Sequence, residues 1–368
     1  MESWLNYLKT APLEIKLNKS ISILHPYLEG RLADVANKQY PRHHLWGINA
    51  IEDLNLSDVS MIEVKKYKLP KIFERFFNRL ILRRSSDVRL ELAGLTASTR
   101  TDLTYSVCGP LAFARFYKKS RLVSWVFRAP ANNPTSTLHP YHNKNLRSHA
   151  GFLCLTPKAE KYFSKFAPSK FLPWCVDLDL FDGEPASINP PRPFFLATGK
   201  TNRDYETLIN GAAVINAELR IIGPEEQRPN QLPSNVNWIN TSVDPPDQAI
   251  DYATLREWYA QSLAVCIPLK GDANDTCGYT NMLEAMAMRK PVIMTRSGSL
   301  HINPKDQNFG FLVEPQDTDG WTHTMEEVLN NPVQNMRMGS EARRIAENDF
   351  SIETFEQELL GFLREMLA

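Results

Sequence analysis

The chain has 368 residues, long enough for two domains, and its 43% hydrophobic and 23% charged residues are typical of a globular protein. Lys and Arg together number 42, as do Asp and Glu, so the formal net charge is zero. This balance argues against nucleic acid as a partner, and any basic site must be local.

The cysteines and the N-terminus favour a cytoplasmic protein. None of the five cysteines belongs to a CxxC pair, so buried free thiols are the ordinary interpretation. Residues 1–24 lack a basic start followed by an apolar stretch, so we expect no signal peptide. No run approaches the roughly 18 apolar residues that span a bilayer. We therefore expect a cytoplasmic location, either free or peripheral at the inner face of a membrane.

In the first half of the chain, short apolar runs alternate with helical patterns. Helix candidates include Leu45–Leu54 and Leu69–Arg84. The strand candidates are Ile21–His25, Met61–Val64, Leu103–Cys108, Arg121–Phe127, Gly151–Leu155 and Phe171–Val176. This alternation predicts a Rossmann-like domain over residues 1–185.

The candidate helix Leu69–Arg84 is amphipathic in an unusual way. Apolar residues fall at positions 72, 73, 76, 77, 80 and 81, and basic residues at 71, 75, 79 and 83. Two interpretations are open. We favour packing of the apolar side on the N-terminal sheet with the cations in solvent. The alternative is peripheral contact of residues 69–84 with an anionic membrane surface.

A proline-rich segment divides the chain. Residues 184–193 hold four prolines, which neither a helix nor a central strand tolerates. Beyond it, the strand candidates are Pro193–Thr198, Leu219–Gly223, Val236–Ile239, Leu263–Leu269, Pro291–Thr295 and Phe311–Val313, and the helix candidates are Asp204–Ala217, Tyr252–Ser262 and Gly278–Arg289. Continuous apolar strands separated by helices indicate a parallel sheet covered on both faces, so residues 186–350 should form a second Rossmann-like domain.

The tail and the two domains complete the expected architecture. Ser351–Leu367 reads as an amphipathic helix with Ser351 as its N-cap, and residues 351–368 are predicted to pack back on the N-terminal domain. The fold class is therefore α/β, with two Rossmann-like domains facing a cleft. Ligands of open parallel sheets bind at the carboxyl ends of the strands, which would line that cleft.

The helix that begins at Gly278 carries the first chemical signal. Gly278 permits close backbone approach, and the amides of Tyr279, Thr280 and Asn281 would be unpaired donors at the helix start. Such amides and the helix dipole favour an anion. Glu284 lies in an otherwise apolar helix, where a carboxylate needs a polar partner such as a pair of vicinal hydroxyls. The alternative is an ordinary buried helix with a surface-facing glutamate.

The end of the strand Pro193–Thr198 carries the second signal. Gly199 ends this strand, and Lys200 and Arg203 follow in the loop that leads into the next helix. Two cations at the carboxyl end of a strand suit a diphosphate leaving group, which gains charge as its bond to a sugar breaks. Solvated loop cations are the alternative.

Several blocks, in order and spacing, resemble the retaining GT-B glycosyltransferases of family 4, the glycosyl transferases group 1. The similar segments cover about half of the chain, and they are Phe171–Phe181, Phe195–Ala212, Tyr252–Leu269, Gly278–Thr295, Gly310–Pro315 and Glu341–Phe355. The resemblance implies the GT-B fold, a nucleotide-sugar donor and a hydroxyl acceptor.

The resemblance also assigns roles on the donor side. Glu284 matches the second glutamate of the family's Glu-x7-Glu pattern, which holds the donor ribose, and Lys200 and Arg203 fall where the family keeps a basic pair on the diphosphate. The first glutamate, which approaches the transferred sugar, is replaced by Thr276. Asp275 or Thr280 could stand in for it, so the identity of the donor sugar is left open.

On the acceptor side the resemblance points to two loops. The loop after the first strand contains Arg42, His43 and His44, which are acceptor-side candidates unless they are surface residues at a helix start. Many relatives keep a histidine after the strand that corresponds to Arg121–Phe127. Here Arg128 follows that strand, so Arg128 or the more distant His149 would take its place.

No metal or other cofactor is expected. Asp177-Leu-Asp179 has the form of a metal-binding DxD motif, but it follows an apolar run and is better explained as structural capping. We see no other cluster of carboxylates, histidines or cysteines with metal-ligand spacing. The nucleotide sugar would be a substrate, and the cations and helix amides would stabilise its leaving group.

The resemblance thus implies a retaining, metal-independent hexosyltransferase that moves a hexose from UDP-glucose or GDP-mannose to a hydroxyl of a glycan, lipid or small metabolite. A catalytically silent GT-B-like scaffold is the first alternative, because Thr276 replaces a family glutamate. A nucleotide-sugar epimerase is the second, although we find no paired acid and base for it. A NAD-dependent dehydrogenase is not favoured, since no G-x-G-x-x-G follows a strand.

Overall fold

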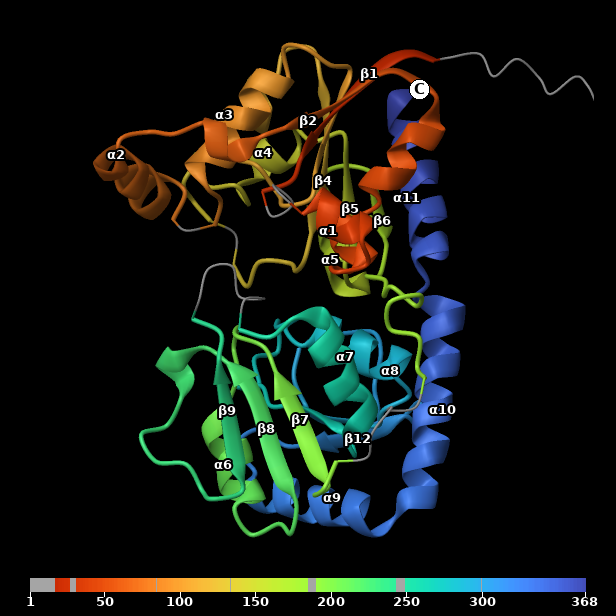
Figure 1. Ribbon diagram of the computed structural model, residues 1–368. Coiled ribbons are helices and arrows are strands. Elements are labelled where there is room, and N and C mark those ends of the chain that lie inside the picture. The colour runs from red at the N-terminus through yellow and green to blue at the C-terminus, as the bar shows by residue number, and fades with distance from the viewer. Residues whose placement is uncertain are drawn as a thin grey trace, which may run out of the picture.

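The computed structural model of the protein describes residues 17–26, 31–83, 85–132, 134–184, 190–242, 249–298 and 300–368. Within these ranges the chain forms two α/β domains, stacked one above the other in Figure 1. Most of the N-terminus, residues 185–189 of the expected linker and Arg84 at the end of one expected helix lie outside the described residues.

The first domain contains a six-stranded sheet whose order is β2-β1-β3-β4-β5-β6. Every neighbouring pair is parallel. The strands are β1 (Leu17–Leu24), β2 (Leu56–Ile62), β3 (Leu103–Ser106), β4 (Arg121–Val126), β5 (Gly151–Cys154) and β6 (Ser169–Phe171). The strand expected at Phe171–Val176 is wrong, because β6 ends at Phe171 and the chain runs on to leave the sheet, so that Val176 bridges Ser351.

Short helices connect these strands. They are α1 (Leu32–Ala36), η1 (Arg42–Leu45), η2 (Ile48–Leu54), η3 (Val64–Lys66), α2 (Lys71–Phe76), η4 (Phe77–Ile81), α3 (Val88–Ala97), η5 (Ala114–Phe116), α4 (Asn143–Leu146) and α5 (Pro157–Phe163). The helix expected at Leu45–Leu54 is instead two 3₁₀ helices, because Trp46 and Gly47 between them adopt positive φ angles of 56° and 73°.

The expected helix Leu69–Arg84 is present as α2 followed by the π-helix η4. Phe77 and Ile81 pack on a small cluster formed by Leu82, Val88 and Ala112. The favoured interpretation, packing of the apolar side on the N-terminal sheet with the cations in solvent, holds only in part. One side of the helix is anchored by Phe77 and Ile81, and the other apolar side chains point away from the domain into solvent.

The second domain repeats the doubly wound arrangement with a parallel sheet of order β12-β11-β10-β7-β8-β9. Its strands are β7 (Phe194–Thr198), β8 (Glu218–Gly223), β9 (Val236–Asn240), β10 (Val265–Ile267), β11 (Val292–Thr295) and β12 (Gly310–Val313). Its helices are α6 (Tyr205–Ala212), η6 (Glu225–Gln227), α7 (Tyr252–Gln261), α8 (Tyr279–Ala287), α9 (Thr318–Asn330) and α10 (Pro332–Asp349). This is the predicted α/β fold.

The last helix, α11 (Ile352–Leu367), leaves the second domain and packs on the first (Figure 1). The side chain of Ser351 caps it by accepting a hydrogen bond from the amide of Thr354. The lack of a side chain at Gly151 lets α11 pack closely against β5, since a Cβ there would lie only 2.7 Å from Cζ of Phe362. Among the described residues, no helix is long and apolar enough to cross a bilayer.

The two domains share one hydrophobic core. It runs from Ile21 and Trp125 of the first sheet to Ile267 of the second and Met286 of α8. Arg343 of α10 links the end of the first domain to α8 of the second, because its guanidinium donates to the carbonyls of Phe181 (2.6 Å) and Ala287 (2.9 Å). A buried guanidinium with two carbonyl acceptors fixes this junction more firmly than packing alone.

Candidate functional site

A cavity of about 1260 Å³ lies between the carboxyl ends of the two sheets. The first domain lines it with Pro26 after β1, Gly109 after β3 and Arg128 after β4, and the second domain contributes Thr201 after β7 and Asn274 after β10. These are the strand ends at which ligands of open α/β sheets bind. The expected cleft is therefore present, and Arg128 is an acceptor-side candidate that lines it.

Arg203 is the centre of the second domain's side of the site. It is 6% exposed, and its guanidinium donates to the carbonyl of Thr201 (2.9 Å) and to Oδ1 of Asn281 at the start of α8 (2.6 Å). Gly199 makes room for this guanidinium: its φ is +125°, and a Cβ there would lie 2.3 Å from Nη2 of Arg203. The two signals read from the sequence thus meet at one place.

Lys200 differs from Arg203 because its side chain is exposed. Among the described residues we find no ion pair to Lys200, and its carbonyl accepts a hydrogen bond from Gln227 (2.6 Å). Tyr205 donates to the carbonyl of Gly199 (2.5 Å) and so steadies the loop that carries both cations. Lys200 is available to an anion, whereas Arg203 is largely occupied by the protein.

The start of α8 presents unused amides. Gly278 is its N-cap, with a φ of 84°, and no hydrogen bond from the amides of Tyr279, Thr280 or Asn281 is found within the described part of the chain. The positive charges of Arg203 and Arg128 both act on the thiol of nearby Cys277, so the first domain also contributes a cation here. Unused amides and cations together are the groups that bind anions at helix N-termini in proteins.

Neither proposed stand-in for the missing glutamate is equivalent to it. Asp275 is 2% exposed and accepts hydrogen bonds from the amide of Cys277 (3.0 Å) and from Nδ2 of Asn202 (2.5 Å). Burial raises the pKa of Asp275, but these hydrogen bonds outweigh burial and hold the pKa below its usual value. Asp275 therefore organises the loop. Thr276 and Thr280 are partly exposed.

The surroundings of Cys277 do not favour a nucleophilic thiolate. Burial first, and then the carboxylate of Asp275, raise the pKa of its thiol to about 12. A raised thiol pKa disfavours thiolate chemistry near neutral pH.

Glu284 is buried rather than open to the cavity. It is 3% exposed, and Oε2 accepts a hydrogen bond of 2.8 Å from the hydroxyl of Tyr259 on α7. Nε2 of His43, from the first domain, lies 3.8 Å from Oε1. Burial raises the pKa of Glu284 to about 7, although hydrogen bonds from Tyr259 and Asn281 oppose this shift. The surface-facing alternative is thus wrong, and the carboxylate meets protein groups in this structure.

Two acceptor-side candidates of the first loop, His43 and His44, lie beside Glu284, and none of the three candidates lines the cavity. The backbone amide of Asp177 donates to Nδ1 of His43 (3.1 Å), which leaves the ring proton on Nε2, facing Glu284. Burial lowers the pKa of His43 to about 3. His44 lies 3.4 Å from the hydroxyl of Tyr252 at the start of α7. Arg42 points away from the cavity toward Asp179 and Glu353. His43 and His44 therefore contact the second domain, whereas Arg42 pairs with the segment after β6 and with α11.

His149 also has a structural role in place of the acceptor-side role predicted from the sequence. It is 5% exposed; Nε2 accepts from the amide of Leu111 (3.2 Å), and Nδ1 lies 2.9 Å from the carbonyl of Asn145. Both ring nitrogens are occupied, so His149 supports the loop after β3 and has none left for an acceptor. Burial also lowers its pKa to about 4. Arg128 is the candidate of this pair that reaches the cavity.

The side chain of Tyr279 likewise turns away from the site. Its ring is buried beside His301 and Phe350, so only the backbone amide of Tyr279 is left to contact a ligand.

The capping interpretation of Asp177-Leu-Asp179 is confirmed: Asp177 accepts from the amides of Leu180 (3.1 Å) and Arg42 (2.8 Å).

One cluster offers ligands of the kind that hold metals. His43, His44 and Glu284 each present an atom within 4.8 Å of the others, and two histidines with a carboxylate are a zinc-type donor set. Residue spacing gave no sign of this cluster, because its members come from different domains. Its groups already meet Tyr252 and Tyr259, and metal independence stays a prediction.

Several residues that contact the predicted site residues were not singled out by the sequence analysis. Tyr259 and Asn202 hold Glu284 and Asp275, and Lys158 of the first domain donates to Oδ1 of Asn274 across the cleft (2.5 Å). Tyrosine, asparagine and lysine are common on any helix or loop, so only their contacts mark them out.

Comparison with known proteins agrees with this geometry. Residues 194–331 match the family model of glycosyl transferases group 1. Sucrose-phosphate synthase from Thermosynechococcus elongatus has a TM-score of 0.65 at 15% identity, covering 95% of this chain and 99% of its own. Anabaena Alr3699/HepE in complex with UDP and glucose has a TM-score of 0.60 at 14% identity, covering 95% and 100%. No curated protein matches the chain.

A third structure has the same fold. WaaG, a glycosyltransferase involved in lipopolysaccharide biosynthesis, has a TM-score of 0.60 at 12% identity over 93% of this chain and 99% of its own. The chain therefore has the fold of GT-B glycosyltransferases, and its second domain carries the glycosyl transferases group 1 match.

Proposed function

We propose that the protein is a retaining hexosyltransferase that uses a nucleoside-diphosphate sugar and needs no metal ion. One observation carries the proposal: Arg203, exposed Lys200 and the unused amides at the start of α8 gather at the strand ends that face the cavity. Arg128 adds a cation from the other domain. A departing diphosphate gains negative charge, and preorganised donors of this kind stabilise it.

The proposed reaction follows from that arrangement. The bond between the sugar's anomeric carbon and the diphosphate oxygen breaks, and the acceptor hydroxyl attacks from the same face. Its proton passes to the departing phosphate oxygen, and configuration is retained. Lys200, Arg128 and the amides of residues 279–281 would hold the diphosphate, while Arg203 holds the loop and Asn281 in place.

We propose UDP-glucose as the first donor to test and GDP-mannose as the second. HepE structures contain UDP and UDP-glucose, which supports UDP-glucose for a chain of the same fold. The hydroxyl acceptor, whether glycan, lipid or metabolite, would enter beside Arg128, at the first domain's wall of the cavity. The cytoplasmic location expected from the unpaired cysteines stays a prediction.

The role of Glu284 in this proposal requires a movement. Its carboxylate would accept the ribose hydroxyls, as the family resemblance implies, but His43 and Tyr259 cover it here. Ribose reaches Glu284 only after the first-domain segment that carries His43 moves away. Donor binding and domain movement are coupled in this scheme, because ribose would have to occupy the space that His43 fills beside Oε1 of Glu284.

The donor assignment is tested by a thermal-shift panel of UDP-, GDP-, ADP- and TDP-sugars. A shift with one nucleotide identifies the donor. The variant Glu284→Ala should lose most of that shift, and Glu365→Ala on the exposed face of α11 should keep it. Full retention of nucleotide affinity and turnover in Glu284→Ala would show that the ribose assignment is wrong.

A catalytically silent scaffold is the second candidate. It is favoured by Thr276, which stands where the family has a glutamate, and by the occupied carboxylate of Asp275. Release of free sugar or of UDP from UDP-glucose by the purified protein would exclude it. Nucleotide binding without any turnover, over a panel of hydroxyl acceptors, would favour the scaffold.

A further inference from the structure

We propose that the outer side of α2 and η4 docks on an anionic lipid bilayer and holds the mouth of the cavity at the membrane surface. We call this surface the lipid face; it consists of Lys71, Ile72, Phe73, Arg75, Phe76, Arg79 and Leu80. The proposal rests on the glycosyl transfer proposed above only where it concerns the acceptor.

Exposed apolar side chains are concentrated on the lipid face. Ile72 is 75% exposed, Phe73 56%, Phe76 51% and Leu80 60%. Four of the ten large exposed hydrophobic side chains found in the described ranges therefore fall within nine consecutive residues. Single exposed apolar residues are normal on proteins, but a contiguous group marks an interaction surface.

This exposure is built into the domain. Phe77 and Ile81 anchor the opposite side of the helix, and Oδ1 of Asn78 accepts a hydrogen bond of 2.8 Å from the amide of Val88. Glu74 also faces inward and pairs with Arg89 at 2.6 Å. Since one side is fixed by these contacts, rotation of the helix cannot bury the lipid face.

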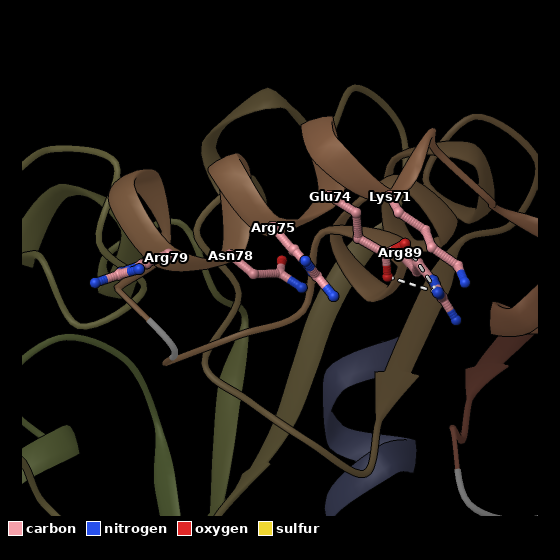
Figure 2. A pocket seen from close by; sticks show the side chains of 6 residues that line it. All are labelled: Lys71, Glu74, Arg75, Asn78, Arg79 and Arg89. Atoms are coloured by element: carbon pink, nitrogen blue, oxygen red, sulfur yellow. Dashed lines mark hydrogen bonds and ion pairs between the residues drawn. The ribbon is translucent and has the colours of Figure 1, made fainter.

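The charge of the lipid face selects an anionic partner. Lys71, Arg75 and Arg79 recur every four residues along one edge of the apolar strip, and no ion pair to any of them is present among the residues the structure describes. Together with Glu74, Asn78 and Arg89 they line a hollow of about 650 Å³ (Figure 2). Cations beside an apolar strip match lipid phosphates above hydrocarbon, which is how interfacial helices bind.

The position of the lipid face links it to the active-site cavity. Arg89 lines both the basic hollow and the cavity between the domains. Lys65 of η3 and Ser86 and Asp87 of the segment before α3 line the cavity as well. A bilayer that meets the lipid face therefore lies beside the first-domain rim of the cavity, where the acceptor would enter. This placement suits an acceptor that is itself held in the membrane.

Vesicle binding tests the proposal directly. The full-length protein should co-sediment with vesicles of mixed phosphatidylcholine and phosphatidylglycerol, and much less with phosphatidylcholine alone. The double variant Ile72→Glu/Phe76→Glu should lower affinity at least tenfold for each side chain. The triple variant Lys71→Gln/Arg75→Gln/Arg79→Gln should lower it about 100-fold and remove most of its salt dependence. Val214→Glu and Met336→Glu, 74% and 66% exposed on the second domain, are matched controls.

Two outcomes would overturn the proposal. One is a wild-type protein that ignores anionic vesicles. The other is self-association, seen as a larger mass in solution that Ile72→Glu/Phe76→Glu abolishes, because the surface would then join two copies of the chain. The nucleotide thermal shift is measured on every variant. It should stay unchanged, which shows that the variants fold and separates a failure of membrane docking from a failure of the proposed function.

Discussion

Replacement of Glu284 by glutamine should change how the protein's stability depends on pH. The carboxylate is buried, and its pKa is raised from 4.5 to about 7. The folded protein therefore keeps a proton on Glu284 at pH values where the unfolded chain has lost it. Stability from this group is fully present below pH 4.5 and is lost as the pH rises through 7. Glutamine mimics the neutral acid and removes this loss.

The size of the effect follows from the shift. Each pKa unit corresponds to about 1.4 kcal/mol, so the shift of Glu284 is worth about 3 kcal/mol. The free energy of unfolding of Glu284→Gln, relative to wild type, should rise by about that amount between pH 4.5 and pH 8. His43 acts oppositely: burial lowers its pKa to about 3, so its stability contribution is lost as the pH falls below 6.5. Both proteins contain His43, so the difference between their curves reports on Glu284 together with its contact to His43.

Urea unfolding followed by tryptophan fluorescence, repeated from pH 4.5 to pH 8, measures this difference. Glu365→Gln, at an exposed position of α11, is the control and should leave the curve parallel to wild type. Parallel curves for Glu284→Gln and wild type would refute the reasoning, because they would mean that Glu284 titrates alike in the folded and unfolded chains.

Three further substitutions test the donor side. Gly278→Ala should destabilise the protein by about 2 kcal/mol, because φ is +84° and the new Cβ would lie 2.5 Å from Cγ2 of Ile267. Gly361→Ala, with no atom within 4 Å of the new Cβ, should be neutral or stabilising; equal melting temperatures for the two variants would contradict the geometry. Lys200→Ala should lower turnover of the donor roughly 10- to 100-fold at an unchanged melting temperature, since the side chain is exposed. Arg128→Ala should lower turnover to a similar degree through loss of charge at the cavity, and Arg128→Lys should recover part of it; wild-type turnover in either alanine variant would remove that residue from the site.

Local signals in the sequence were sufficient for most of the fold. Apolar runs of strand length between helical patterns predicted both parallel sheets, and Asp204 and Ser351 cap the helices they were expected to begin. Such signals depend on near neighbours in the chain. The errors occurred where backbone conformation or distant packing decided the outcome, as at Trp46 and Gly47 and at the end of β6.

One feature of the predicted donor side, the approach of the two sequence signals to each other, is present in the structure. Arg203 and Asn281 do meet, because strand ends of a parallel sheet converge at one edge. The acceptor side was not predictable. Arg42, His43 and His149 carry suitable chemistry, yet which groups surround them depends on how the domains pack, and packing gave them structural roles.

The sequence by itself determined the two α/β domains and the amphipathic character of residues 69–84, since both follow from the order of residue types along the chain. Only the tertiary structure decided that Glu284 is covered by His43 and that Ile72, Phe73, Phe76 and Leu80 face solvent. Burial depends on what packs against a side chain, and the partners of these residues, or their absence among the described residues, arise from segments far away in the chain.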